Sequence, residues 1–190
     1  MQRKKFIKRF LLLGGGAVAA VSGFKAYHVF KSPDFGLLTE ALPLISELAD
    51  TIIPRTDTPG AKDAGVGAFI VLMVKDCCPT ATQNRFIDGV KDLAIYTQMG
   101  YGRPFDKCSI AERTAVLKHF EKKSVFFKGT AAKVEHKLLG DPFFTTLKKY
   151  TVLGYCSSKA GATQALAYQA VPGHYINTDL KPGQKAWATQ

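Results

Sequence analysis

The sequence predicts an all-α fold, an irregular bundle of about five to six helices with a non-regular C-terminal tail. In several stretches apolar residues recur at intervals of three and four, the period of an amphipathic helix. No stretch shows the sustained alternation of a half-buried strand, and no repeat of fixed period is visible. With 190 residues, 46% of them hydrophobic, the chain has the size and composition of one domain with a real core.

The first two expected helices flank a loop rich in proline and glycine. The first covers residues 40–53, with Thr39 as its N-terminal cap, and ends at Pro54. The second begins after Asp63, which can cap it, and ends before Pro79. Their buried stripes are expected at Leu42, Ile45, Leu48, Ala49 and Ile52, and at Val66, Phe69, Ile70, Met73, Val74 and Cys77.

Three further helices follow. Residues 80–99 form the third, which the glycines at positions 100 and 102 break. In "SIAE", Ser109 and Glu112 form a capping box, in which each side chain satisfies the other's backbone amide, and this box begins the fourth. The fifth continues from Pro142, and a short helical piece, "ATQALAY", precedes the tail. Their apolar faces are expected at Phe86, Ile87, Val90, Leu93 and Ala94, at Ile110, Val116, Leu117 and Phe120, and at Phe143, Leu147, Tyr150 and Leu153.

Residues 1–22 are typical of an export signal, with a basic stretch followed by an apolar, glycine-containing one too short to span a bilayer comfortably. The segment resembles the twin-arginine consensus R-R-x-F-L-K, with Lys4 in place of the second arginine. The matching positions are Arg3, Lys4, Phe6, Ile7 and Lys8. We therefore expect a periplasmic protein, with residues 1–22 cleaved or kept as an anchor, a linker at 23–36 and the helical domain at 37–190. A buried N-terminal helix is the alternative, disfavoured because five basic residues make poor core.

The net charge is +11, and the part after residue 22 still carries about +6. Nucleic-acid binding is not expected, because no basic motif interleaved with aromatic residues is present. Solvated lysine-rich faces, attracted to an anionic membrane or an acidic partner, explain this charge better.

The four cysteines are Cys77, Cys78, Cys108 and Cys156. An even number in an exported chain allows disulfides, with the pairing undetermined. One intrachain bond plus a thiol that faces a partner is one interpretation. Four buried, inert thiols are the other.

No catalytic or cofactor motif is found. The glycine-rich stretches lack the strand and third glycine of a dinucleotide fingerprint, so we expect no FAD or NAD on this chain. Cys-x-x-Cys-His is absent, and so is G-x-S-x-G, which excludes an attached c-type haem and offers no nucleophile.

No metal site is expected either, because His28, His119, His136 and His174 have no second ligand at helical spacing. Of the four, only His174, in a loop, is a candidate for a contact with a partner. Asp50, Asp57 and Asp63 can be imagined as paired carboxylates, but Asp50 and Asp63 are better explained as helix-terminal groups.

Two blocks carry a family resemblance: "LADTIIPRTDTPGAKDAGVGAFI" at residues 48–70 and "GYCSSKAGATQALAYQAVPGHY" at residues 154–175. They resemble the gluconate 2-dehydrogenase subunit 3 family over residues 37–187. Members are small subunits of periplasmic sugar and polyol dehydrogenases. They accompany a large FAD subunit of the glucose-methanol-choline type and often a c-type cytochrome.

The resemblance implies a non-catalytic subunit that binds and stabilises the folded FAD subunit and escorts it through the twin-arginine translocase. The FAD would lie on the partner and no catalytic residue on this chain. Where the family more often has Gly-Tyr-Tyr-Thr-Ser, this chain has Cys156 after Tyr155, which indicates a contact special to this subgroup.

Aromatic residues with a polar tip are frequent at interface cores, so the C-terminal part of the chain is the expected docking surface. Its candidate residues are Tyr155, Cys156, Tyr168, Pro172, His174, Tyr175 and Trp187. Tyr155 and Tyr168 can alternatively close the bundle itself. For the whole chain, the alternatives are a stand-alone, membrane-tethered periplasmic binding or scaffold protein and an enzyme in its own right.

Overall fold

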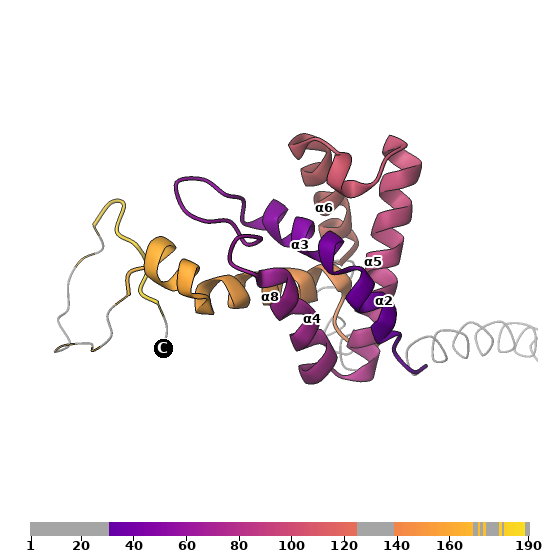
Figure 1. Ribbon diagram of the computed structural model, residues 1–190, viewed down its shortest axis with the longest axis horizontal. Coiled ribbons are helices and arrows are strands. Elements are labelled where there is room, and N and C mark those ends of the chain that lie inside the picture. Colours follow the sequence, from indigo (N-terminus) through magenta and orange to yellow (C-terminus); the bar gives the residue numbers. More distant parts are fainter. Residues whose placement is uncertain are drawn as a thin grey trace, which may run out of the picture.

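The computed structural model describes residues 31–124, 139–168, 171, 173, 179 and 181–188 (Figure 1). These residues form helices and no β-strand, which confirms the all-α prediction. Within the described ranges, the only sheet-like pairing is an isolated bridge between Ala167 and Trp187. No helix among them combines the length and the apolar character that crossing a membrane requires.

The elements follow one another along the chain with short connections. They are α2 (Phe35–Glu40), α3 (Leu42–Ile52), α4 (Val66–Cys77), α5 (Thr80–Tyr101), the 3₁₀ turn η1 (Phe105–Lys107), α6 (Ile110–Ser124), α8 (Phe143–Ser157) and the π-helical turn η2 (Gly161–Ala165). The first described helix begins two residues before the expected domain boundary at residue 37.

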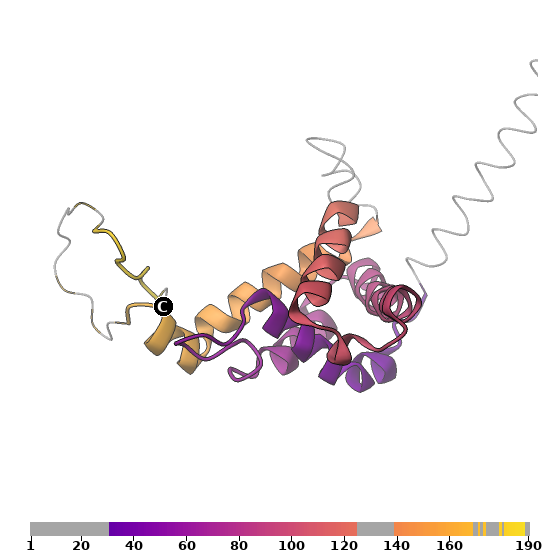
Figure 2. The same ribbon diagram turned by 90° about the horizontal axis from the view of Figure 1, so that it is seen from above.

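Helix α8 is the central element, because it packs against α3, α4, α5 and α6. It runs across the direction of α5 and continues towards the C-terminal segment, residues 167–188 (Figure 1). Figure 2 gives the view from above, in which α8 passes alongside the other helices and α5 is seen nearly end-on. Gly89 of α5 allows the close approach of α8, since a Cβ there would lie 2.3 Å from the Phe143 ring.

The core is apolar and continuous across the helices. Its largest fully buried side chains are Phe86, Phe105, Leu38, Ile45, Leu48, Ile70, Ile87, Leu93, Leu147, Val66, Val74 and Val116. Most of the expected stripe residues are among them, because the helical period brings one face of each helix inward.

Two predicted N-terminal caps are wrong. Asp34, not Thr39, caps the first helix, and its carboxylate accepts a hydrogen bond from the Leu37 amide at 3.0 Å. Gly65, not Asp63, precedes α4, with a left-handed φ of 69° that favours glycine. The chain reverses at this glycine, so α4 begins too late for Asp63 to reach its free amides.

The other predicted ends agree more closely with the structure. Pro79 separates α4 from α5, and Gly102, with a φ of 66°, ends α5, whereas Gly100 lies inside that helix. The capping box is confirmed: Glu112 Oε2 accepts from the Ser109 amide at 2.7 Å, and the Glu112 amide donates to Ser109 Oγ at 3.4 Å.

Two stripe residues are not in the core. Ile110 is 82% exposed and Leu153 is 45% exposed. Ile110 begins α6, and its first turn extends past the neighbouring helices; Leu153 lies on α8 beside the buried Gly154. Periodicity identifies an apolar face but does not say how far along it the neighbouring helices reach.

Candidate functional site

The loop between α3 and α4, residues 53–65, forms a fixed corner. Asp50 of α3 accepts a hydrogen bond from the Lys62 amide at 3.2 Å, and Asp63 accepts one from the Gly60 amide at 3.1 Å. Ala61 is fully buried, and its amide donates to the Ile53 carbonyl at 2.9 Å. Asp50 and Asp63 therefore hold the corner through its backbone amides, which corrects their interpretation as helix-terminal groups.

The corner is also attached to α8. The Tyr155 hydroxyl donates to the Pro59 carbonyl at 2.7 Å, and the Tyr155 side chain is buried. Gly60 has no room for a side chain, since a Cβ would lie 2.5 Å from Asp50 Oδ1. The two family blocks of the sequence thus meet in space at this contact.

Asp57 is the remaining carboxylate of the predicted acidic set, and it lies exposed on the corner. It accepts a hydrogen bond from Thr56 Oγ1 at 2.9 Å, which is the main reason that its pKa is lowered. Since Asp50 and Asp63 are engaged with backbone amides, the three carboxylates do not act together as an acid–base pair.

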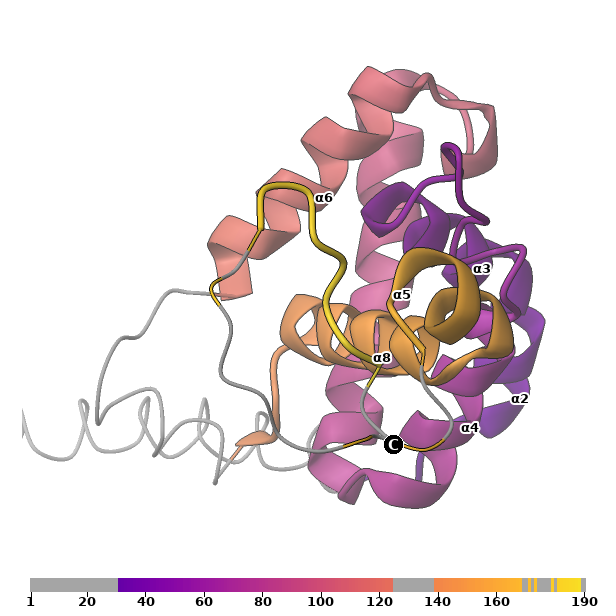
Figure 3. The ribbon, with the colours of Figure 1, turned by 90° about the vertical axis from the view of Figure 1, so that its left-hand side faces the viewer.

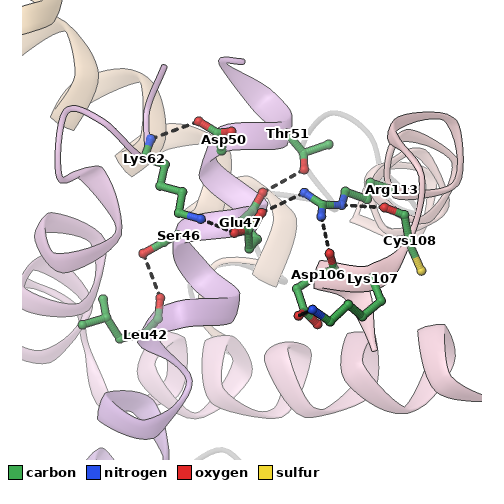
Figure 4. Close-up of polar contacts among 10 residues, drawn as sticks. All are labelled: Leu42, Ser46, Glu47, Asp50, Thr51, Lys62, Asp106, Lys107, Cys108 and Arg113. Atoms are coloured by element: carbon green, nitrogen blue, oxygen red, sulfur yellow. Dashed lines mark hydrogen bonds and ion pairs between the residues drawn. The ribbon is translucent and has the colours of Figure 1, made fainter. Parts of the chain in front are cut away.

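A polar clamp lies beside the corner, formed by Glu47, Lys62 and Arg113 (Figure 4). One carboxylate oxygen of Glu47 accepts from the Lys62 ammonium, and the other accepts from Arg113 Nη1 at 2.7 Å. The Glu47 and Arg113 side chains are only 16% and 19% exposed, whereas that of Lys62 is 55% exposed. The buried half of the clamp is therefore the Glu47–Arg113 pair.

Arg113 joins three elements. Its guanidinium donates to the carbonyls of Asp106, at 2.6 Å, and Cys108, at 3.0 Å, besides the bond to Glu47 (Figure 4). It also lies over the Phe105 ring, 5.5 Å from the ring centroid. One side chain of α6 thus holds α3 and η1, as the planar, multi-donor guanidinium is suited to do.

The clamp keeps its charges at neutral pH. The hydrogen bond from Lys62 is the largest influence on Glu47, and with Arg113 it holds the pKa of that carboxyl below its ordinary value near 4.5, against the opposing effect of burial. The same contact raises the pKa of Lys62. Because both Glu47 oxygens are engaged by cations, this carboxylate serves structure better than proton transfer.

An open groove of about 880 Å³ adjoins the clamp. Its lining consists of Glu40, Pro43, Leu44, Ser46, Glu47 and Lys62 on one side and Ala94, Ile95, Gln98, Met99, Pro104, Phe105 and Asp106 on the other. We call it the α3–α5 groove. Two of its apolar residues are largely exposed, Ile95 at 57% and Met99 at 82%.

The four cysteines, all in described residues, are free, so the disulfide interpretation does not hold here. Cys77 and Cys78 precede α5, which is about 33 Å long, and Cys108 follows the other end of that helix. A disulfide needs Cα atoms within about 7 Å. Cys156 is half-buried on α8.

The thiols differ in their surroundings. Cys77 is exposed, while Cys108 is buried. Cys78 Sγ lies 3.3 Å from the Tyr150 hydroxyl, and burial raises the pKa of both groups. The interpretation of four buried, inert thiols therefore fails at Cys77.

Among the described residues, no three histidine, cysteine, aspartate or glutamate side chains gather as metal ligands. His119 stacks on Tyr96, with ring centroids 4.4 Å apart. His28, His136 and His174 lie outside the described residues, as do the export-signal positions Arg3, Lys4, Phe6, Ile7 and Lys8.

The predicted docking residues divide into three groups. Tyr155 is in the core, where its hydroxyl holds the corner, so it is removed from the docking surface. Tyr168 and Trp187 are exposed, at 53% and 60%, and Cys156 is half-buried. Pro172, His174 and Tyr175 lie outside the described residues.

Sequence reasoning missed the clamp and the groove. Lys62 lies 15 positions and Arg113 lies 66 positions from Glu47, so no local spacing connects them. The available signal was an arginine next to a capping box, in "SIAERTAV", whose charge has no partner on its own helix.

Fold and site together define an all-α domain with a clamped helix-to-helix corner and an adjacent open groove. Comparison with protein families identifies the group: the model described as gluconate 2-dehydrogenase subunit 3 matches residues 39–173, which include the whole corner. The chain belongs to the gluconate 2-dehydrogenase subunit 3 family, whose name denotes a subunit of a dehydrogenase complex. No curated protein and no solved structure matched the chain.

Proposed function

We propose that this chain is a non-catalytic accessory subunit that binds and stabilises a large FAD-dependent dehydrogenase subunit and helps to export it to the periplasm. The substrate of that complex would be a sugar, a sugar acid or a glycoside, and a c-type cytochrome would receive the electrons. Family membership over residues 39–173 is the observation that carries the proposal.

The use of the charged side chains supports a structural role. Glu47, the carboxylate in the buried half of the clamp, is fully engaged by Lys62 and Arg113. The acids of the corner bind backbone amides of the same loop. These groups fix the shape of the domain, which is what a partner-binding surface requires.

The C-terminal segment supports partner binding. Its base is closed by two hydrogen bonds of 2.8 Å, from the Ala167 amide to the Ala186 carbonyl and from the Ala188 amide to the Ala167 carbonyl. Beside this base, Tyr168 and Trp187 expose aromatic surface, and Val171 is 78% exposed. Figure 3 looks onto this end of the molecule, where the described parts of the segment lie in front of α8. Exposed aromatic residues on an anchored segment are suitable interface anchors.

The leader supports the export role. Its basic residues, apolar stretch and glycines match a twin-arginine signal, and that route carries folded proteins with their cofactors already bound. A large subunit without a signal of its own would cross the membrane only in complex with this chain.

Co-expression with the flavoprotein encoded beside this chain tests the proposal. We expect the two proteins to purify together with FAD bound, and deletion of this chain to remove dehydrogenase activity from the periplasm. An isolated chain that binds no flavoprotein, together with unchanged periplasmic activity after the deletion, would refute the proposal. A stable monomer that binds a small periplasmic ligand would instead support the stand-alone binding protein.

The signal is tested separately. Arg3→Lys removes the remaining arginine of the consensus and should reduce export of both proteins in parallel, measured as periplasmic antigen and flavin. Lys25→Arg, a basic position outside the signal, is the matched control. Unchanged export of the Arg3→Lys variant would exclude the twin-arginine route.

A further inference from the structure

The α3–α5 groove is a preformed apolar surface. Leu44, Ile95 and Met99 line it together with Phe105, which is 2% exposed. The clamp fixes its walls, because Arg113 holds both α3 and η1. A rigid surface loses little conformational entropy on binding, which favours affinity.

The shape of the groove indicates a helix rather than a small molecule. Small-molecule sites bury about 70–90% of the ligand, whereas here Ile95 and Met99 are themselves more than half exposed. These two residues are four positions apart on α5, about 6 Å along its axis. That distance corresponds to about one turn of a second helix lying alongside, whose apolar side chains at i and i+4 would face them.

The charges of the groove indicate the sign of the occupant. Its lining contains three carboxylates, Glu40, Glu47 and Asp106, and one base, Lys62, whose ammonium is bound to Glu47. Glu40 has no ion-pair partner among the described residues, and the Asp106–Lys107 pair is exposed, with 3.7 Å between its charged atoms. A local excess of negative charge on a chain of net charge +11 is therefore presented at the rim.

From these observations we propose that the α3–α5 groove binds an amphipathic helix of the large dehydrogenase subunit, with apolar residues on one face and lysine or arginine at its edge. The inference rests on the proposed function and adds the surface and the chemistry of the partner segment. The acidic rim orients the helix and speeds its association, and the apolar floor supplies most of the affinity.

The groove would be a second attachment point. Figure 1 places α5 and the C-terminal segment towards opposite ends of the described chain. Two separate contacts raise the overall affinity through the effective concentration of the second, so a change in one contact weakens the complex without abolishing it.

Photo-crosslinking in the co-purified complex identifies the occupant. A photoreactive side chain at position 99 should crosslink to a single helix of the large subunit, and peptide mass spectrometry should find lysine or arginine at the edge of that helix. The same group at position 72 is the control, since Leu72 is 55% exposed on α4, away from the groove. Crosslinks to residues 1–22 of this chain, to a second copy or to no protein would overturn the assignment.

Substitutions give an independent measurement. Met99→Asp places a charge on the apolar floor beside an acidic rim, so we expect the dissociation constant of the complex to rise at least about tenfold. Glu40→Lys should raise it about threefold and steepen its loss at low salt. Leu72→Asp should leave it unchanged, and the thermal midpoint of each isolated variant should match that of the wild type because all three positions are exposed.

The outcomes separate the two proposals. If the wild-type chain forms no complex, the proposed function fails, and the groove assignment fails with it. If the complex forms and Met99→Asp binds as tightly as wild type, only the groove assignment fails.

Discussion

Removal of the Glu47 charge is the sharpest test of the clamp. In Glu47→Gln the neutral amide replaces a carboxylate that accepts from Arg113 at 2.7 Å in a largely buried pair and from a half-exposed Lys62. A hydrogen bond between charged groups contributes about 1.5–3 kcal/mol, and an exposed ion pair about 0–1 kcal/mol. We therefore expect the free energy of unfolding to fall by about 2–4 kcal/mol.

The assay is urea unfolding of the isolated chain, followed by circular dichroism at pH 7. Glu40→Gln, a change of the same chemistry at an exposed carboxylate, is the matched control and should shift the free energy by less than about 0.5 kcal/mol. Double-mutant cycles should give a coupling of about 1–3 kcal/mol between Glu47 and Arg113 and less than about 1 kcal/mol between Glu47 and Lys62.

The pH dependence has a defined sign. Because the pKa of Glu47 in the folded state lies below its ordinary value near 4.5, the clamp contributes fully above about pH 4.5. Its contribution is lost as the pH falls through the folded-state pKa, so wild type and Glu47→Gln should converge in acid. The reasoning is refuted if Glu47→Gln unfolds at the wild-type urea midpoint, or if the difference between the two proteins grows as the pH is lowered.

Three further predictions concern packing and thiol chemistry. Gly89→Ala should destabilise the chain by about 1–3 kcal/mol through the clash with α8, whereas Gly100→Ala, in open space on the same helix, should stabilise it by about 0.5–1 kcal/mol; equal urea midpoints would contradict this. Tyr155→Phe should lower the free energy of unfolding by about 1 kcal/mol and leave partner affinity unchanged, and a selective loss of affinity would return Tyr155 to the interface. With a thiol reagent under native conditions, Cys77 should react first and Cys108 last; loss of the fast phase in Cys77→Ser checks the assignment.

The helices were largely predictable because their signals are local. A capping box connects residues three apart, and each apolar stripe repeats within one helix, so Ser109, Glu112 and Pro79 mark their boundaries in the sequence itself. The caps at Asp34 and Gly65 were missed for a different reason. More than one residue near each start can serve as a cap, and the path of the preceding chain selects between them.

The candidate site was much less predictable. Tyr155 was expected at an interface, and its burial depends on the corner that lies 96 positions earlier in the chain. Whether an aromatic residue closes its own domain or contacts a partner depends on which surfaces the helices cover, and periodicity carries no such information.

The sequence by itself determined the all-α class, the helix order, the signal-like leader and the family, because these depend on short spacings and contiguous blocks. Tertiary structure alone decided the clamp and the groove. Glu47, Lys62 and Arg113 meet only after α3, the corner and α6 have packed, and the groove is the space left between α3 and α5 once η1 is held in place. Long-range ion pairs and surface hollows result from packing, and no local pattern in the chain specifies them.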